Sequence, residues 1–440
     1  ECCWAAGVPR DALRYLRVPD NEVGRHLVSH LDIDAVILTG AYETADLFRS
    51  WKPDLRIFAE TSGKNSMIVT PNADLDLAVA DLASSAFGHS GQKCSAASLA
   101  ILVADAYDSE RFRRQLVDAV TSLEVGAADD LSTTMGPTIA PPTGKLLRAL
   151  TELESGERWL VEPHELEPGL WTPGVRENVQ PGSWFHRTEC FGPVLGLVRA
   201  RDLDEAIDIQ NGTDFGLTGG IHSLDEREVD VWLDRVEVGN AYVNRVTTGA
   251  IVQRQPFGGW KRSTIGPGAK AGGPNYVAQL GTWQPSAGEV EDERWLLRAT
   301  ASDEVWWAEE FGREHDPTGL TCESNRFRYR PVGRVVIVVG AGRDVAGRRV
   351  VVAATRCGCD VTVVNDRDES GGQVVGLVRR IRPDRIRVVG ECAPELRQVA
   401  DELAIHVADD PVTSNGRIEL LHYLREQAIS RTMHRYGNLL

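Results

Sequence analysis

The chain has 440 residues, a formal net charge of −16 and a pI near 5.2. That length predicts two or three domains, and the acidic balance, with no long basic stripe, argues against a nucleic-acid partner, because phosphate backbones are bound by clustered lysine and arginine. The sequence holds no apolar run of about 18 residues and no signal peptide, so we expect a cytoplasmic protein without a transmembrane segment.

Eight cysteines are scattered along the chain without the spacing of a disulfide framework or a zinc site. Cys2 and Cys3 are adjacent, and Cys357 and Cys359 lie too close together for a zinc clamp. We therefore expect reduced thiols and no metal. The chain begins with Glu1 rather than methionine, and we expect it to begin within a domain.

Strand and helix patterns alternate along the first hundred residues, which is typical of an α/β protein. The first strand ends at Thr39 and Gly40, where a cofactor phosphate or a nicotinamide could approach the backbone, although turn geometry alone also explains a Thr-Gly ending. The predicted strands are 33–38, 55–60 and 66–70, and the predicted helices are 41–51 and 74–87, the second capped by Asn72 or Asp74.

The loop "GHSGQKC", residues 88–94, places a cysteine directly after a stretch rich in glycine. A buried cysteine needs no such approach, whereas a nucleophilic thiolate needs stabilisation by backbone N–H groups or a nearby cation. The loop amides and Lys93 could stabilise a thiolate at Cys94. Glu60, at the end of a predicted strand, is a candidate general acid or base. From these residues alone, an inert buried cysteine is the commoner alternative.

The alternation continues through the strand "FGPVLGLVRA" and the helix "DLDEAIDIQN". The segment "QPFGGWKRSTIGPGAKAGGP" is too rich in glycine and proline for regular structure. Composition changes after Trp283, where "QPSAGEVEDER" indicates a polar linker and a domain boundary. A second α/β unit begins after Arg330, and residues 417–436 have the apolar spacing of an amphipathic packing helix.

The second unit contains a glycine pattern that imitates a dinucleotide-binding fingerprint. Gly340 and Gly342 follow a predicted strand, and Asp366 ends the next one. However, the third glycine position falls on Val345, and Gly347 comes two residues late. We therefore expect a Rossmann-like domain that holds no second cofactor.

Four motifs together resemble the aldehyde dehydrogenase superfamily: "FAETSGKN", "GQKCSA", "TECFGPVLGLV" and "QPFGGWKRS" occur in its order and spacing over residues 1–283. Within it, "VILTGAYETADLF" and "GPGAKAGGPNYV" are most similar to the L-glutamate γ-semialdehyde (Δ1-pyrroline-5-carboxylate) dehydrogenase part of bifunctional proline utilization A. The tail "GRIELLHYLREQAISRTMHRYGN" is similar to the closing motif of its long forms, which carry an extra C-terminal domain.

The resemblance implies NAD-dependent oxidation of L-glutamate γ-semialdehyde to glutamate, the second step of proline catabolism. Cys94 would attack the aldehyde carbon, hydride would pass to NAD, and Glu60 would activate the water that hydrolyses the thioester. Thr39, Gly40, Glu189 and Phe191 would contact the cofactor, Glu189 through the nicotinamide ribose. By residue type alone, Glu189 would be a solvated surface charge.

The resemblance also implies the substrate contacts. Ser95 and the backbone of Gly249 and Ala250 would hold the α-carboxylate, which N–H groups and a hydroxyl can do without a second cation. Phe87 and Phe257 would box the aliphatic chain, although core packing is an equal alternative for both.

Two positions depart from the family pattern. Ser62 and Thr264 stand where glycine is usual, and the loop after Thr264 is slightly longer. The family's oxyanion asparagine and an FAD-dependent proline dehydrogenase domain would lie upstream, so we expect the chain as given to be almost inactive, since one missing oxyanion donor costs about 3 kcal/mol.

The expected fold is α/β and aldehyde dehydrogenase-like, followed by a second Rossmann-like α/β domain. Its partner would be the small-molecule substrate, and a homo-oligomer is compatible with it. Another aldehyde dehydrogenase and a non-catalytic channelling module are the alternatives. The expected parts are the end of an NAD-binding domain (1–60), a catalytic domain (61–258), a Gly-rich return segment and flap (259–283), a linker (284–330) and a non-catalytic C-terminal domain with a closing lid motif (331–440).

Overall fold

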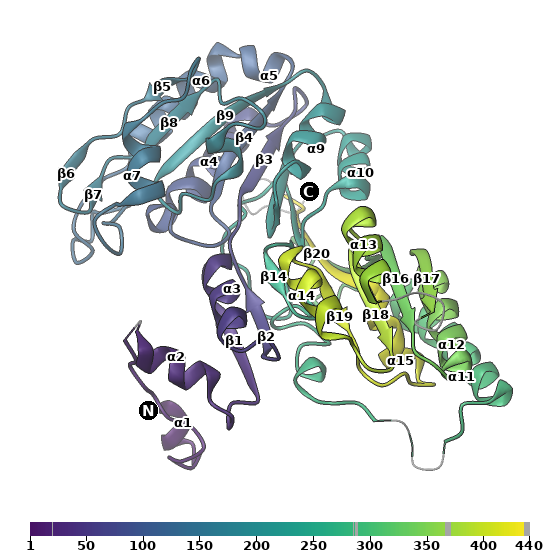
Figure 1. Ribbon diagram of the computed structural model, residues 1–440. Helices are drawn as coiled ribbons and strands as arrows, with labels where there is room; N and C mark the ends of the chain where they lie inside the picture. The colour runs from purple at the N-terminus through teal and green to yellow at the C-terminus, as the bar shows by residue number, and fades with distance from the viewer. Residues whose placement is uncertain (20, 285, 287–288, 366–370, 435–440) are drawn as a thin grey trace.

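The computed structural model describes residues 1–19, 21–284, 286, 289–365 and 371–434. It has three parts: a small N-terminal sheet with its helices, a large mixed sheet between helices, and a C-terminal α/β unit (Figure 1). Asp366, the end of the predicted fingerprint, lies outside the described residues. Every helix within these residues is too short or too polar to cross a membrane.

The N-terminal part is a three-stranded sheet in the order β1-β2-β14. The parallel strands β1 and β2 pair Thr39 with Glu60, and the antiparallel β14 pairs Thr264 with the same Glu60. Three strand ends therefore meet at this glutamate. The predicted strands 33–38 and 55–60 and the predicted helix 41–51 are confirmed to within two residues, whereas the segment 255–274, predicted to be irregular, contributes the short strand β14. The elements of this part are α1 (Cys2–Ala5), α2 (Glu22–Ser29), β1 (Ala35–Thr39), α3 (Tyr42–Trp51), β2 (Arg56–Glu60) and β14 (Thr264–Ile265).

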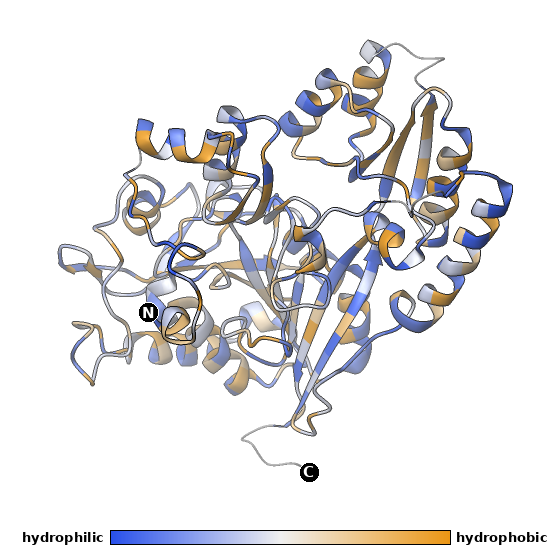
Figure 2. Ribbon diagram, turned by 90° about the horizontal axis from the view of Figure 1, so that it is seen from below, coloured by the Kyte–Doolittle hydropathy of each residue, from blue (hydrophilic) through white to orange (hydrophobic). Residues whose placement is uncertain are grey.

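The large sheet has nine strands in the order β15-β20-β12-β11-β3-β4-β9-β8-β5. Alternate side chains of β3 enter two separate hydrophobic clusters: Ile68 packs with Trp232 of α10 on one face, and Met67 packs with Leu82 of α4 on the other. The strand is buried along its length because helices cover both faces. Figure 2 shows the helices striped with hydrophobic and hydrophilic residues, as this arrangement requires.

The elements of this part follow in chain order. The strands are β3 (Asn65–Val69), β4 (Ala97–Val103), β5 (Arg158–Val161), β6 (Glu165–Glu167), β7 (Leu170–Trp171), β8 (Gly174–Glu177), β9 (Val194–Ala200), β10 (Phe215–Gly216), β11 (Thr218–His222), β12 (Asn240–Val243) and β13 (Trp260–Lys261). The helices are α4 (Leu75–Phe87), η1 (Gly88–Gly91), α5 (Asp105–Asp108), α6 (Glu110–Thr121), α7 (Gly144–Thr151), α8 (Trp184–Arg187), α9 (Leu203–Asn211), α10 (Glu226–Arg235) and η2 (Ala278–Leu280).

The C-terminal unit is a four-stranded parallel sheet in the order β17-β16-β18-β19. A Cβ on Gly347 would lie 2.8 Å from Val339 Cγ1, so this glycine lets α12 pack closely on β16. Its elements are β16 (Arg334–Val339), α12 (Asp344–Arg356), β17 (Asp360–Asn365), α13 (Gly371–Ile381), β18 (Arg385–Val389), α14 (Pro394–Glu402), β19 (His406–Ala408), α15 (Gly416–Glu419) and η4 (Leu420–Tyr423).

The interval 284–330, expected as a linker, is largely folded. It contains α11 (Glu293–Trp306), η3 (Trp307–Phe311) and most of β15 (Glu323–Pro331). Trp295 and Phe327 from these elements are buried in the same hydrophobic cluster as Val335 of β16. The acidic residues around 289–293 have the composition of a linker, but they lie at the start of α11, so composition alone did not indicate this packing.

The prediction of a helix over 417–436 is wrong for most of its described residues. The chain turns through α15 and η4 and then forms a nine-residue strand, β20 (Leu424–Thr432). β20 pairs with β12 in parallel and with β15 in antiparallel register, so it lies inside the large sheet. The residues Leu424 and Ile429 fit a helical spacing by coincidence, and pairing on both edges overrides it.

We expect α11 to be essential for the stability of the C-terminal unit. Asp303 of α11 accepts two hydrogen bonds from Arg349 of α12, at 2.6 and 2.8 Å, and both side chains are at most 1% exposed. Asp303→Asn should reduce the free energy of unfolding by about 3–5 kcal/mol, because it leaves a buried guanidinium without its charge partner. Denaturant unfolding followed by tryptophan fluorescence measures it.

The adjacent Glu304 provides a matched control. It pairs with Arg356 at 3.2 Å on the surface. Glu304→Gln should change the free energy of unfolding by no more than about 1 kcal/mol. Equal effects of the two substitutions would contradict the role assigned to α11.

Candidate active site

Cys94 lies in the loop between η1 and β4, and Asn65 fixes the backbone of that loop. Asn65 Nδ2 donates to the carbonyl oxygens of Cys94 at 2.7 Å and Ala96 at 2.9 Å, while Asn65 Oδ1 accepts from the N–H of Thr218. The asparagine is buried at the start of β3, so its amide cannot swing away. Asn65 is the last residue of the motif "FAETSGKN", and the sequence alone indicated no role for it. Its place directly after "SGK" was the available signal.

The Gly-rich loop before Cys94 packs closely against residues 189–193, and this contact requires a glycine. Gly91 has φ +66°, and a Cβ there would overlap the carbonyl of Gly192. Gln92 Nε2 donates to the carbonyl oxygen of Phe191 at 3.2 Å, and Gln92 Oε1 accepts from the N–H of Ile139. The glycine and the glutamine therefore have positional roles that a merely buried cysteine would not require.

Glu60 is the last residue of β2, and its carboxylate points to the segment after Phe257. Its Oε2 accepts from the N–H of Gly259 at 3.0 Å, and a Cβ on Gly258 would lie 2.9 Å from Oε1. Burial raises the pKa of Glu60 to about 8, and the nearby Lys270 opposes this shift. A cavity of about 70 Å³, lined by Glu60, Thr39 and Tyr276, adjoins it. The carboxyl can therefore exchange a proton near neutral pH.

Glu189 is the second carboxylate of the site. Its Oε1 accepts from the N–H of Gly63 at 2.7 Å. Burial raises its pKa, and hydrogen bonds from Gly63 and Ser62 oppose the shift. Ser62, a departure from the family pattern, thus helps to hold this carboxylate.

Cys94, Glu60 and Glu189 form one electrostatic site. The pKa of the Cys94 thiol is raised, mainly by burial and further by both carboxylates, while the N–H of Ser95 opposes the shift. The sequence prediction that loop amides stabilise the thiolate is supported by this N–H. The expected net stabilisation is wrong, however, because burial and two carboxylates outweigh it, and Lys93 is not among the groups that lower the pKa.

The residues predicted to bind the cofactor lie at two places around this site. Thr39 and Gly40 are exposed at the C-terminal end of β1, where α3 begins after Ala41. Open α/β sheets bind dinucleotides at this end of their parallel strands, so these residues fit an NAD molecule. Phe191 is 39% exposed with φ +58°, and it adjoins Glu189. Its exposed ring is available to a planar ligand.

Thr247 links the two segments that are predicted to bind the substrate carboxylate. Thr247 Oγ1 donates to the carbonyl oxygen of Ser95 at 2.9 Å, and its N–H donates to Ser85 Oγ. Gly249 and Ala250, two and three residues further on, are exposed, and Gly249 has φ +84°. Their backbone amides therefore lie in an open loop beside the nucleophile loop.

The two predicted phenylalanines differ. Phe87 is 1% exposed and belongs to the hydrophobic cluster of α4 and β4, so core packing accounts for it. Phe257 is half-buried, and its backbone pairs with Ala271 through two hydrogen bonds. It stays a candidate for contact with the aliphatic part of a substrate.

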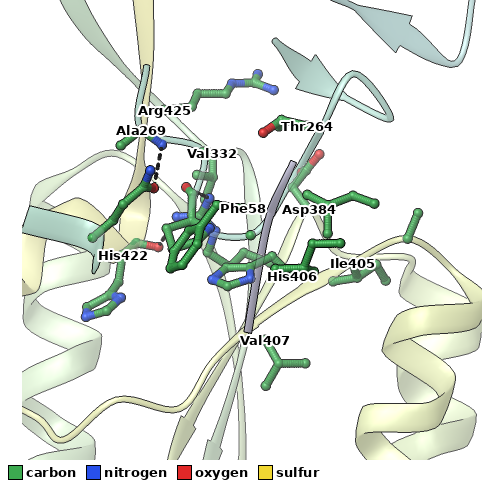
Figure 3. Close-up of a pocket in the computed structure, with 18 of the residues that line it drawn as sticks. Phe58, Thr264, Ala269, Val332, Asp384, Ile405, His406, Val407, His422 and Arg425 are labelled. Carbon is green, nitrogen blue, oxygen red and sulfur yellow. Dashed lines mark hydrogen bonds between the residues drawn. The ribbon is translucent and has the colours of Figure 1, made fainter. Parts of the chain in front are cut away.

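A separate cavity of about 780 Å³ lies behind the active-site segment, between β2, the return segment and the C-terminal unit (Figure 3). Phe58, Thr264 and Ala269 of the N-terminal sheet and the return segment line it, together with His406 and His422 of the C-terminal unit. The return segment, residues 259–283, therefore lines this cavity and also contacts Glu60.

The chain is similar to several known proteins. Proline utilization A (PutA) from Corynebacterium freiburgense is similar at 53% identity and a TM-score of 0.87, over 96% of this chain and 44% of that one. A 1-pyrroline-5-carboxylate dehydrogenase from Geobacillus sp. (strain WCH70) is 38% identical over 283 residues, 62% of this chain and 54% of its own length.

A structure of 1-pyrroline-5-carboxylate dehydrogenase from Thermus with bound NAD is 33% identical, with a TM-score of 0.57, over 62% of this chain and 55% of that one. The chain thus spans about half the length of the relatives that it matches. The model of the Aldehyde dehydrogenase family matches residues 1–283, which carry Cys94, Glu60 and Glu189, and the chain belongs to this family.

Proposed function

We propose that this chain carries the catalytic half of an NAD-dependent dehydrogenase that oxidises L-glutamate γ-semialdehyde to L-glutamate. The observation that carries the proposal is the common site of Cys94, Glu60 and Glu189, whose charges act on one another. The relatives support the choice of substrate, because the curated relatives that match over 283 residues are named 1-pyrroline-5-carboxylate dehydrogenases.

In the first step, the Cys94 thiolate forms a bond to the aldehyde carbon, and the carbonyl oxygen becomes an alkoxide. The backbone N–H of Cys94 is placed to stabilise this oxyanion, because Asn65 fixes the loop through the carbonyl of the same residue. The thiol begins with a raised pKa, so the step needs a base to remove its proton. Glu60 and Glu189 are the carboxylates within electrostatic reach.

In the second step the carbon loses hydride, and a thioester forms on Cys94. NAD, when bound, supplies the hydride acceptor. Thr39, Gly40, Glu189 and Phe191 are the residues proposed to hold it. The Glu189 carboxylate, already oriented by the Gly63 N–H, retains acceptor capacity for a ribose hydroxyl.

In the third step water attacks the thioester, the carbon–sulfur bond breaks, and glutamate leaves. Glu60 takes the proton of the water, and the sulfur leaves as the thiolate of Cys94. A carboxylate whose pKa is about 8 is a stronger base than an exposed one, and the N–H of Gly259 aims it. Ser95, Gly249 and Ala250 are proposed to hold the substrate α-carboxylate during all three steps.

The relation to a longer bifunctional enzyme belongs to the same proposal. The PutA structure matches 96% of this chain, including the C-terminal unit. A proline dehydrogenase domain with FAD, joined to this chain, would supply the semialdehyde. A cytoplasmic, homo-oligomeric enzyme is part of the proposal, and the eight free thiols, all of them in described parts of the chain, fit a reducing compartment.

Replacing the nucleophile should abolish the reaction. In the complete natural protein, Cys94→Ala should lower the rate of NADH formation from glutamate semialdehyde by at least about 10⁴-fold, because no thioester can form. Cys322→Ala is the matched control, since Cys322 is also a half-buried free thiol but lies before β15. Retained activity in the first variant would contradict the proposal and favour a non-catalytic module.

Replacing Glu60 should separate the two halves of the reaction. Glu60→Gln should leave a first-turnover burst of NADH, because Glu189 remains as a base for the Cys94 thiol. The steady state should then slow by about 10²-fold or more, because hydrolysis loses its base. Intact-mass spectrometry should find the glutamyl thioester on Cys94. In the unmodified enzyme the steady-state rate should rise as pH increases through about 8, because the pKa of Glu60 is raised and its ionised form is required. An unchanged steady-state rate in the variant, with no thioester on Cys94, would be the contrary result.

The proposed carboxylate contact should determine substrate preference. Ser95→Ala should lower kcat/KM for glutamate semialdehyde by about 10-fold or more, because a charge-assisted hydrogen bond is worth about 1.5–3 kcal/mol. Propanal, which has no carboxylate, should be oxidised at an unchanged rate by the same variant. Equal losses for both aldehydes would instead favour another aldehyde dehydrogenase.

A further inference from the structure

Lys270 is a completely buried cation beside Glu60, and it has no role in the reaction as described above. It lies in the return segment, directly after Ala269, which lines the cavity of Figure 3. Its Nζ donates to the carbonyl oxygen of Gly258 and, at 3.1 Å, to Asn240 Oδ1. A buried lysine without a direct carboxylate contact is costly, so its retention calls for an explanation.

Glu60 and Lys270 both lie close to the place that a side chain on Gly258 would occupy. A Cβ on Gly258 would lie 2.9 Å from Glu60 Oε1 and 3.3 Å from Lys270 Cγ. A Cβ on Gly239 would lie 2.6 Å from Lys270 Nζ. The next N–H along the chain, that of Gly259, is the hydrogen-bond donor to Glu60. Lys270 therefore binds one end of the peptide unit whose other end orients the carboxylate.

The C-terminal strand β20 reaches the same lysine. Glu426 Oε2 accepts from the backbone N–H of Lys270 at 2.7 Å, and Glu426 Oε1 accepts from Asn275 Nδ2 at 2.6 Å. Glu426 is 4% exposed. Its neighbour Arg425 lines the same cavity as Ala269, so β20 and the return segment form adjoining parts of the cavity wall (Figure 3).

We propose that Lys270 is a positioning residue for Glu60 and that Glu426 couples this lysine to β20. The proposal rests on the role of Glu60 as the base of the proposed reaction. The lysine holds the Gly258–Gly259 peptide and provides a positive charge that favours the ionised carboxylate. The strand provides a negative charge that opposes it.

Charged and titratable groups face Glu60 from several of the elements packed around it. The pKa of Glu60 is raised mainly by burial, lowered by Lys270 and raised by Glu426. Glu60 in turn raises the pKa values of Cys94, in the nucleophile loop, and of Tyr276, in the return segment. The carboxylates Glu60 and Glu426 both favour the charged form of Lys270, against its burial.

The test is the pH dependence of hydrolysis in the complete natural protein. Lys270→Met should move the midpoint of the steady-state rate to higher pH by about one unit or more, because an opposite charge is lost. At pH 7.5 the rate should fall about tenfold, because less of Glu60 is ionised. The first-turnover burst of NADH should be retained. Glu426→Gln should move the midpoint to lower pH, because a like charge is lost.

The opposite signs distinguish this proposal from a structural role, which would lower the rate at every pH in both variants. Lys261→Met is the matched control, because Lys261 lies in the same segment but binds the carbonyl of Asn211 and the carboxylate of Glu237. Its pH midpoint should be unchanged. Unmoved midpoints in the Lys270 and Glu426 variants would overturn the proposal. Absence of NADH formation in the unmodified protein would instead overturn the proposed function.

If Lys270→Met fails to fold, Glu426→Gln alone keeps the proposal testable. The amide oxygen of the introduced glutamine can still accept the hydrogen bond from the Lys270 N–H, whereas its NH2 group faces Asn275 Nδ2 and that hydrogen bond is lost. The substitution keeps the shape of the side chain and removes its charge. A midpoint that moves to higher pH in this variant, or does not move, would overturn the proposal.

Discussion

The burial of the Glu60 carboxyl is the constraint on which the site depends. Removing a carboxylate from water raises its pKa, and only compensating hydrogen bonds and charges make the ionised form accessible. The compensation here comes from far along the chain: the N–H of Gly259 and the ammonium of Lys270. The three strand ends that meet at Glu60 fix the position of its backbone. The fold must therefore place the N–H of Gly259 and the ammonium of Lys270 next to the carboxyl.

Close contact between backbones explains why the site motifs are rich in glycine. A Cβ on Gly63 would lie 2.9 Å from the carbonyl oxygen of Cys94, and a Cβ on Gly91 would overlap Gly192. A Cβ on Gly258 would likewise lie too close to Glu60 Oε1, at 2.9 Å, and to Lys270 Cγ, at 3.3 Å. Hydrogen-bond donors for buried carboxylates are mostly backbone N–H groups in this site, and these donate only where side chains do not intervene.

Local patterns predicted the α/β fold well, because strands such as β3 and helices such as α4 carry their burial in a short stretch of sequence. The motifs also brought together Cys94, Glu60 and Glu189. The failures are non-local. β20 has partners nearly 200 residues away in β12, and Glu426 binds a residue 156 positions earlier, so neither could be found from spacing. The raised pKa of Cys94 comes mainly from burial in the folded chain, and two carboxylates distant in the sequence add to it.

The placement of β20 links the stability of the C-terminal unit to the geometry of the site. β12 pairs with β20, and Asn240 of β12 accepts from both the N–H of Gly258 and Lys270 Nζ. Trp260 Nε1 donates to the carbonyl of Glu426 at 2.7 Å, which joins the same segment to β20 a second time. A displacement of β20 would therefore change the position of the Gly258–Gly259 peptide. Because that peptide orients Glu60, a unit far from Cys94 in sequence can influence the chemistry without contacting a reacting atom.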